Sequence, residues 1–222
     1  MATHYKGYSF NTPSDRMVLC LDASNIKSYP GSGTTWYNIA GLTQGSYNAT
    51  LTNTTFASNT IVFNGSTSYG AVTSPLSGYR YNWTIEIGVK CTNASSGPMI
   101  LNPGNAGIDQ HISFGPTNCS INFTRIADYD GHGLAATITP SNYNVLTFVR
   151  TPNEIRIYVN GKLGGLLVDT QINAEFSSTW NIARRGNNTY LTAGNLGSIK
   201  VWKRVLDDNE VLLSATGSGR NV

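Results

Sequence analysis

The sequence contains little charge. Acidic and basic side chains make up 12% of its 222 residues, against about a quarter in typical soluble proteins. The 15 Lys and Arg residues exceed the 12 Asp and Glu residues by only three, whereas a nucleic-acid surface needs a dense stripe of cations. Five cations gather near the carboxyl end: Arg184, Arg185, Lys200, Lys203 and Arg204. Because Asp and Glu residues follow them, we expect a solvated, charge-balanced face and no nucleic-acid partner.

Cysteine is also scarce. Cys20, Cys91 and Cys119 form no Cys-x-x-Cys pair, and no His lies at zinc-finger spacing, which argues against a zinc site. Each lies among strand-like residues, so we interpret them as buried, reduced thiols. No run approaches 18 apolar residues, and the first residues lack a secretory signal pattern. The sequence therefore predicts no membrane partner and a protein made and kept in a cytoplasm.

Catalytic motifs are missing as well. No Gly-x-Ser-x-Gly elbow, phosphate loop or dinucleotide-binding glycine pattern occurs. Glu86 lies on a strand-like segment, but Thr84 and Gly88 flank it two residues away. Retaining glycoside hydrolysis needs a second carboxylate on the same face, which these residues do not supply. We expect Glu86 to be an exposed strand residue and the protein not to be an enzyme.

Strand patterns dominate what is present. Residues 83–89 alternate apolar and polar side chains, as a half-buried strand does. Residues 154–167 alternate similarly up to Asn160-Gly161, a pair suited to the positive φ angles of a type I′ hairpin turn. Further short apolar runs cover residues 18–21, 61–63, 112–114, 121–126, 145–149 and 199–202. Many short strands without long helical periodicity indicate an all-β fold of two packed antiparallel sheets.

A short helix is expected near the carboxyl end. Asp207 can cap it, Glu210 follows three residues later as in a capping box, and Gly217 would end it. The length suits a single all-β domain. The chain then divides into an amino-terminal arm over residues 1–16, a sandwich over 17–215 and a Gly/Ser-rich tail over 216–222.

Two segments carry a family resemblance, residues 144–165 and residues 180–211. Their motifs are Tyr158-Val159-Asn160-Gly161, then Gly197 to Trp202, then Arg204-Val205-Leu206 with Glu210. These motifs resemble the carboxyl-terminal half of laminin G-like, concanavalin A-like lectin/glucanase domains. The resemblance implies an antiparallel two-sheet jelly-roll sandwich.

Residues 17–41 carry a second resemblance. Leu21-Asp22-Ala23, Ser28 to Gly33 and Thr35-Trp36 resemble a lead-in found on structural proteins of phages, including cyanophages and marine phages, that carry this domain. The resemblance implies a virion protein assembled in the host cytoplasm, either a capsid decoration or cement protein or a tail or fibre component. Its partners would be other virion proteins and further copies of itself in a homo-oligomer. The alternative is a carbohydrate-binding adhesin that recognises host surface glycans.

Tyrosines in loop-like contexts are the candidate binding residues. Tyr129, Tyr143 and Tyr190 lie beside Asn or Asp, a combination that suits a sugar ring and its hydroxyls. Aromatics at a subunit contact would look the same, so both interpretations stay open. Asp128 and Asp130 precede glycines in a loop that resembles a calcium loop but lacks its further carboxylates. We expect an ordinary Asp-Gly turn and no cofactor, with calcium as the alternative.

The arm is the candidate docking segment. It contains Tyr5, Tyr8 and Phe10, aromatic rings that a lone flexible tail would expose to water. Covering three such rings removes on the order of 400 Å² of surface from water and favours attachment by several kcal/mol, at about 25 cal/mol per Å². We expect the arm to dock on another virion subunit or on a second copy of this chain.

Overall fold

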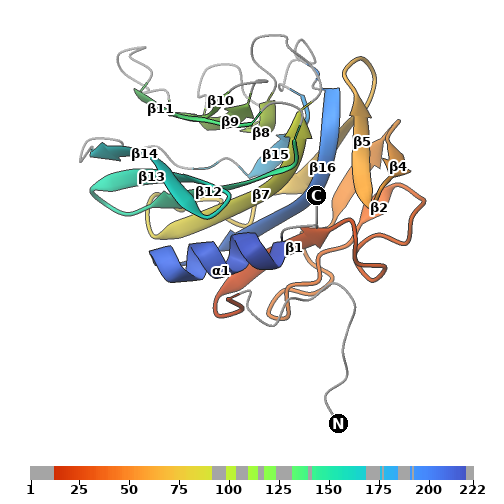
Figure 1. Cartoon of the computed structure of the whole chain (residues 1–222). Helices are drawn as coiled ribbons and strands as arrows, with labels where there is room; N and C mark the ends of the chain where they lie inside the picture. The colour runs from red at the N-terminus through yellow and green to blue at the C-terminus, as the bar shows by residue number, and fades with distance from the viewer. Residues whose placement is uncertain are drawn as a thin grey trace.

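The fold is a sandwich of two sheets (Figure 1). The structure, a computed structural model, describes residues 13–91, 99–103, 110–114, 118–123, 132–139, 142–168, 176, 178–184, 191 and 193–218. Within these residues, sixteen strands pair antiparallel into two eight-stranded sheets, and one helix lies near the carboxyl end. The predicted all-β, two-sheet architecture is confirmed.

Sheet A has β16 at its centre. Its strands are β1 (Met17–Asp22), β4 (Thr55–Ala57), β5 (Thr60–Asn64), β7 (Trp83–Cys91), β12 (Asn144–Arg150), β13 (Glu154–Val159), β14 (Lys162–Val168) and β16 (Ala193–Trp202). They run in the order β14-β13-β12-β7-β16-β5-β4. The side of β16 opposite β7 pairs first with β5 and then with β1. The register with β7 shifts between Leu196 and Ser198, at the point of that exchange.

Sheet B packs against one face of sheet A. Its strands are β2 (Thr35–Trp36), β3 (Ala49–Thr52), β6 (Tyr69–Thr73), β8 (Met99–Pro103), β9 (Gln110–Phe114), β10 (Asn118–Phe123), β11 (His132–Thr137) and β15 (Thr179–Ile182). They run in the order β11-β10-β9-β8-β15-β6-β3-β2. The main core lies between the sheets and buries Trp36, Trp83 and Trp180. The strand expected over residues 83–89 is confirmed, and Ile85 and Ile87 point into this core, but the expectation of a half-buried strand is wrong, because Thr84 and Glu86 on its other face are buried as well.

The local signals for the hairpin and the helix are confirmed. Asn160 and Gly161 adopt φ angles of 52° and 78° between β13 and β14. Helix α1 (Asp208–Ser218) begins with the expected capping box. The Asp207 carboxylate accepts a hydrogen bond from the Glu210 amide at 2.9 Å, and the Glu210 carboxylate accepts one from the Asp207 amide at 3.1 Å. The helix runs one residue past Gly217, the end that the sequence predicts.

Helix α1 covers the outer face of sheet A, the face turned away from sheet B (Figure 1). A second apolar cluster lies there and includes Trp202, Leu206 and Val211. The Tyr158 hydroxyl donates a hydrogen bond to the Asp208 carboxylate at 2.6 Å and so ties the helix to β13. Burial, followed by the hydrogen bond to Asp208, raises the pKa of Tyr158 to about 12, so this bond persists through the physiological pH range.

The lead-in over residues 17–41 is an integral part of the sandwich. It supplies β1 to sheet A and β2 to sheet B. Ser28 holds its loop closed, because its hydroxyl accepts from the Asp22 amide at 3.0 Å and donates to the Tyr37 carbonyl at 2.6 Å. The buried side chain of Asn38 accepts a hydrogen bond at Oδ1 from the Cys20 backbone N–H at 2.8 Å, and its Nδ2 donates to the Val18 carbonyl at 3.2 Å. The segment that carries the phage resemblance therefore contributes strands and hydrogen bonds that stabilise this fold.

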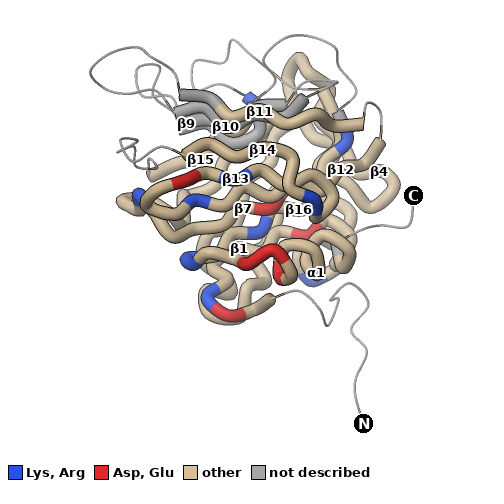
Figure 2. Tube along the Cα trace, turned by 60° about the vertical axis from the view of Figure 1, so that its left-hand side comes forward, with Lys and Arg blue, Asp and Glu red and all other residues tan. Residues whose placement is uncertain are grey.

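Charge is sparse along the chain, and acidic residues mark the first turn of α1 (Figure 2). The expected solvated face near the carboxyl end is wrong for Lys200, which is 6% exposed. It is also wrong for Arg204, which is partly buried in a polar network described below. Among the described residues α1 is the single helix, and it is too short to span a bilayer.

Candidate functional site

Most of the predicted site residues lie outside the described part of the chain. These are Tyr5, Tyr8 and Phe10 of the arm, the tyrosines Tyr129 and Tyr190, and the calcium-loop candidates Asp128 and Asp130. Their roles stay predictions. Within the described ranges, no three His, Cys, Asp or Glu side chains gather in a metal-binding group. Cys20 is a buried thiol, as expected for it; the side chains of Cys91 and Cys119 lie outside the described set.

Tyr143 packs against the outer face of sheet A. Its phenol lies over Gly88 of β7 and Gly197 of β16, where a Cβ atom on either glycine would collide with the hydroxyl. The two glycines thus create the space that the half-buried ring occupies. This packing gives Tyr143 a structural role. Its predicted contact with a glycan or a subunit stays a prediction.

Glu86 is buried, so the expectation of an exposed strand residue is wrong. It points to the outer face of sheet A, where it is 0% exposed beneath the elements that cover that face. Lys200 of β16 lies directly across the ladder, and its ammonium donates to Glu86 Oε1 at 2.9 Å. Burial is the largest single influence on the pKa of Lys200 and would lower it, but the attraction and hydrogen bond of Glu86, together with the influence of Cys20 and Asp22, outweigh burial and raise that pKa. The Lys200 ammonium therefore stays charged beside Glu86.

The surroundings of Glu86 determine what it can do chemically. Its cross-strand neighbours are Thr147 on β12 and Lys200 on β16. None of its neighbours along or across the sheet is a carboxylate. Retaining hydrolysis uses two carboxyl groups about 5–5.5 Å apart. In this arrangement Glu86 can form an internal ion pair, but its sheet neighbours offer no partner for acid and nucleophile chemistry.

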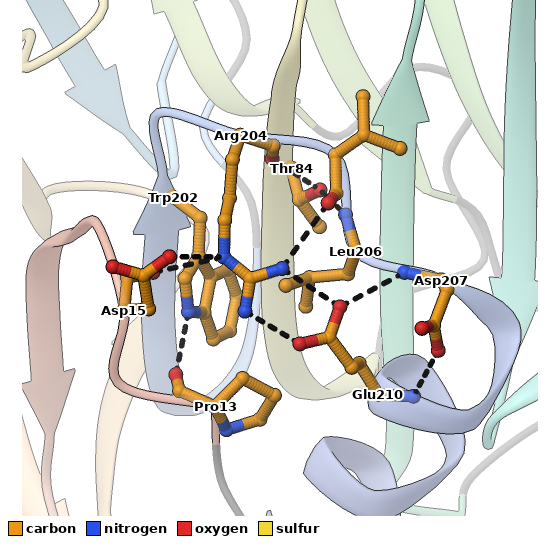
Figure 3. A network of polar contacts seen from close by, with 9 residues as sticks. Pro13, Asp15, Thr84, Trp202, Arg204, Leu206, Asp207 and Glu210 are labelled. Atoms are coloured by element: carbon orange, nitrogen blue, oxygen red, sulfur yellow. Dashed lines mark hydrogen bonds and ion pairs between the residues drawn. The ribbon is translucent and has the colours of Figure 1, made fainter.

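A polar network fixes the root of the arm (Figure 3). The Trp202 indole donates a hydrogen bond to the Pro13 carbonyl at 2.7 Å. The Arg204 Nε donates to the Asp15 carbonyl at 3.0 Å and lies 3.5 Å from an Asp15 carboxylate oxygen. We call these contacts the arm clamp. They hold residues 13–16 against the end of β16.

The arm clamp extends to the helix through one bidentate ion pair. The two terminal nitrogens of Arg204 donate to the two Glu210 carboxylate oxygens at 2.7 and 2.6 Å. The hydrogen bond from Arg204 is the main reason that the pKa of Glu210 falls below its ordinary value of 4.5. The same bond, more than any other effect, raises the pKa of Arg204. Glu210 therefore both caps α1 and holds the side chain that grips the arm.

The outer face of sheet B, the face turned away from sheet A, has a different character. Trp180 and Ile182 point into the core, so Asn181 between them belongs to the outer face. Ala71 pairs with Asn181 on one side and with the exposed Thr50 on the other. Small and hydroxyl-bearing residues therefore line this face on neighbouring strands. Hydroxyl and amide groups on a firm surface are suited to sugar hydroxyls.

Comparison with known families identifies the fold family. The family model for the concanavalin A-like lectin/glucanases superfamily matches residues 64–212, more than half of the chain. The chain belongs to this superfamily. The match begins after the lead-in, although the lead-in contributes strands to both sheets. A comparison with curated proteins finds no match.

Solved structures with the same fold include botulinum neurotoxins. One is neurotoxin type C, whose cell entry depends upon interaction with two ganglioside molecules; it has 13% identity, a TM-score of 0.70 and coverage of 93% of this chain and 52% of that one. Another is the binding domain of neurotoxin DC in complex with rat synaptotagmin II, with 14% identity, a TM-score of 0.70 and coverage of 94% and 53%. At such identities the likeness shows the fold alone. This chain spans about half the length of those chains.

The arm clamp is the feature that sequence reasoning missed. Arg204 falls within a family-like motif and Glu210 within a capping box, so each has a local explanation. Their pairing depends on the turn between β16 and α1, and the contacts of Arg204 and Trp202 with Asp15 and Pro13 join residues 189 positions apart. An Arg six residues before a capping-box Glu was the only available signal for the pair.

Proposed function

We propose that this chain is a non-enzymatic binding domain that serves as a structural component of a phage virion. Its place there is that of a capsid decoration or cement protein, or of a tail or fibre component. The observation that carries the proposal is the arm clamp, because it gives an aromatic arm a fixed point of departure from a folded domain. The likeness of residues 17–41 to phage structural proteins supplies the virion context.

The non-enzymatic part is supported by the state of Glu86. The carboxylate is buried and neutralised by Lys200, so it is withdrawn from solvent and from any substrate. A general acid or nucleophile must reach the scissile bond. In this chain Glu86 forms a buried ion pair with Lys200 that contributes to packing and stability.

The partners in this proposal are other virion proteins and further copies of the chain. Arm residues 1–12 carry Tyr5, Tyr8 and Phe10 and contain no Asp or Glu. They precede Pro13 and Asp15, which the arm clamp holds at the end of β16. An arm tethered at one rigid point loses less conformational freedom on docking than a free peptide does.

The test separates the arm from the domain. Deleting residues 2–12 leaves the arm clamp intact, and replacing Tyr5, Tyr8 and Phe10 with Ser in a chain of full length is the matched control for arm length. Both variants should keep the wild-type melting temperature and be lost from purified particles, as measured by quantitative mass spectrometry. Incorporation of either variant at normal copy number would refute attachment through the aromatic arm.

A second candidate is a carbohydrate-binding adhesin that recognises host surface glycans. The outer face of sheet B favours it, because the exposed Thr50, the small Ala71 and the amide of Asn181 lie side by side on adjacent strands. The superfamily includes lectins, and one solved neighbour is the binding domain of neurotoxin DC in complex with SialylT. A glycan array with the intact protein tests this candidate. Binding to no glycan on the array would reject it.

A further inference from the structure

Strand β14 forms one edge of sheet A and is rich in apolar residues (Figure 1). Among the described strands, β13 alone pairs with it. Its seven residues, Lys162–Val168, include three leucines and a valine but no Pro, Asp or Glu. Edge strands usually stay short or carry charges or Pro, because their unpaired N–H and C=O groups can pair with another strand. Lys162 is the one charge that β14 carries.

Three other edges of the two sheets are short or covered. β4 has three residues and β2 has two, while β1 is buried and its Cys20 carbonyl accepts a hydrogen bond from the Ile39 amide. A fourth edge, β11 of sheet B, lies over the inner side of β14, since a Cβ atom on Gly164 would come within 3.0 Å of Ala136 Cβ. The outer face and the edge of β14 are therefore the parts that face solvent.

A β-bulge gathers the exposed side chains of β14 on its outer face. The pairing with β13 leaves one extra residue, Gly164, between Leu163 and Gly165. Leu163 and Leu166 are three positions apart and would lie on opposite faces of a regular strand, but the bulge puts them on the same face. Val168 follows on that face. These three side chains are 54%, 49% and 70% exposed, so each leaves about half of its surface or more in water.

The apolar surface continues onto α1. Leu212 lies against the turn between β13 and β14, because a Cβ atom on Gly161 would come within 2.9 Å of Leu212 Cδ1. Leu212 is itself exposed, and Leu163 follows Gly161 by two residues. We call Leu163, Leu166, Val168 and Leu212 the edge strip. Contiguous apolar surface of this kind is typical of a contact with another protein.

The charges around β14 favour a second copy of the chain as the occupant. Lys162 begins the strand, and Glu154 of β13 pairs with Val168 at the other end. If two copies of β14 pair antiparallel, Lys162 of each copy comes to the end at which the other copy carries Glu154. Parallel pairing would put the two Lys162 ammoniums side by side, which is unfavourable. An antiparallel pair has a two-fold axis, so the edge strip of each copy meets that of the other.

We propose that two copies of this chain pair through β14, antiparallel and about a two-fold axis, so that sheet A continues from one copy into the other. Each strand then supplies partners for the outward N–H and C=O groups of the other, and the two edge strips pack together. The strand is already formed in each copy, so pairing loses little conformational freedom. This contact lies within the folded domain and rests neither on the arm nor on a role in a virion.

Sedimentation velocity of the whole chain tests the pairing. The wild type should pass from monomer to dimer, and no further, between about 1 and about 100 μM, the range of an interface of modest area. Leu166→Lys and Val168→Lys should each raise the dissociation constant about tenfold or more, because a charge on an edge strand opposes pairing. Leu42→Lys is the matched control, since Leu42 lies between β2 and β3 and is 72% exposed. It should dimerise as wild type does.

Two further measurements separate this contact from others. Deletion of residues 2–12 should leave the dimer unchanged, whereas association through the arm would be lost. Hydrogen exchange in residues 162–168 should slow as the dimer forms. A wild type that stays monomeric up to about 100 μM, assembly beyond the dimer, or a dimer that survives both Lys variants would overturn the proposal, as would a dimer that requires the arm. Melting temperatures of the Lys variants within a few degrees of wild type show that they lose pairing and not folding.

Discussion

Removing one member of the buried Glu86–Lys200 pair should lower the free energy of unfolding far more than removing both members does. Lys200→Met replaces the side chain with one of similar length, so little cavity forms, but it leaves a carboxylate that is 0% exposed without its cation. Breaking a buried pair in this way costs about 3–5 kcal/mol. For a domain of this size, a loss of 3 kcal/mol lowers the melting temperature by roughly 6–12 °C.

Urea unfolding followed by tryptophan fluorescence measures this loss, since Trp36, Trp83, Trp180 and Trp202 are all buried. The control is the double variant Glu86→Gln/Lys200→Met, which removes both charges of the pair. It should recover most of the lost stability. The reasoning is refuted if Lys200→Met unfolds within about 1 kcal/mol of wild type at pH 7, or if the double variant is no more stable than Lys200→Met.

The other predictions concern the cap of α1, the space that Gly88 leaves for Tyr143, metal binding and hydrolysis. Arg204 lowers the pKa of Glu210, so the stabilisation that the Glu210 carboxylate supplies is present above about pH 4.5 and is lost as pH falls through the folded pKa. Glu210→Gln should therefore cost about 1–2 kcal/mol at pH 7 in urea unfolding, and progressively less as the pH falls below 4.5. Gly88→Ala should cost about 1–3 kcal/mol, and less in a Tyr143→Phe background, which lacks the hydroxyl that the new methyl meets. EDTA should leave the melting temperature unchanged; a fall of several degrees that Asp130→Asn abolishes would show bound calcium. No reducing ends should be released from laminarin; release that Glu86→Gln abolishes would show hydrolysis.

Two results would contradict the first pair of these predictions. A cost for Glu210→Gln that does not fall at all as the pH is lowered below about 4.5 would mean that the charge of Glu210 is not what stabilises the cap. An equal cost for Gly88→Ala with and without the Tyr143 hydroxyl would place the crowding elsewhere, against the nearby Ser198 hydroxyl.

Local chemistry explains why much of the fold could be predicted from the sequence. The alternation over residues 83–89, the Asn160-Gly161 turn and the Asp207–Glu210 capping box each specify a structure within a few residues. Burial of Glu86 could not be predicted in this way. It depends on Lys200, 114 positions away, and on the elements that cover the outer face of sheet A. In the sequence pattern of a half-buried strand, a polar residue is ordinarily predicted to be exposed to solvent.

The candidate site was less predictable for the same reason. The sequence marks Tyr143 as a candidate because it is an aromatic residue beside Asn. Its packing could not be predicted, because the two glycines that it contacts lie on separate strands, β7 and β16. The edge strip has no motif of its own, since Leu163 shares a face with Leu166 only through the bulge at Gly164. Both settings are properties of sheet pairing. They become visible only when neighbouring strands are aligned.

The arm clamp also determines how a mechanical pull on the arm is shared. Without it, tension on residue 16 would act on the end of β1 and open its ladder to β16 one hydrogen bond at a time. With Pro13 bound to Trp202 and Asp15 bound to Arg204, the force enters the chain at the end of β16, which β7 supports along its length, and passes through Glu210 into α1. Several bonds then bear the load together, which slows forced unfolding. A domain tethered in this way can be dragged by its arm without being unravelled from its first strand.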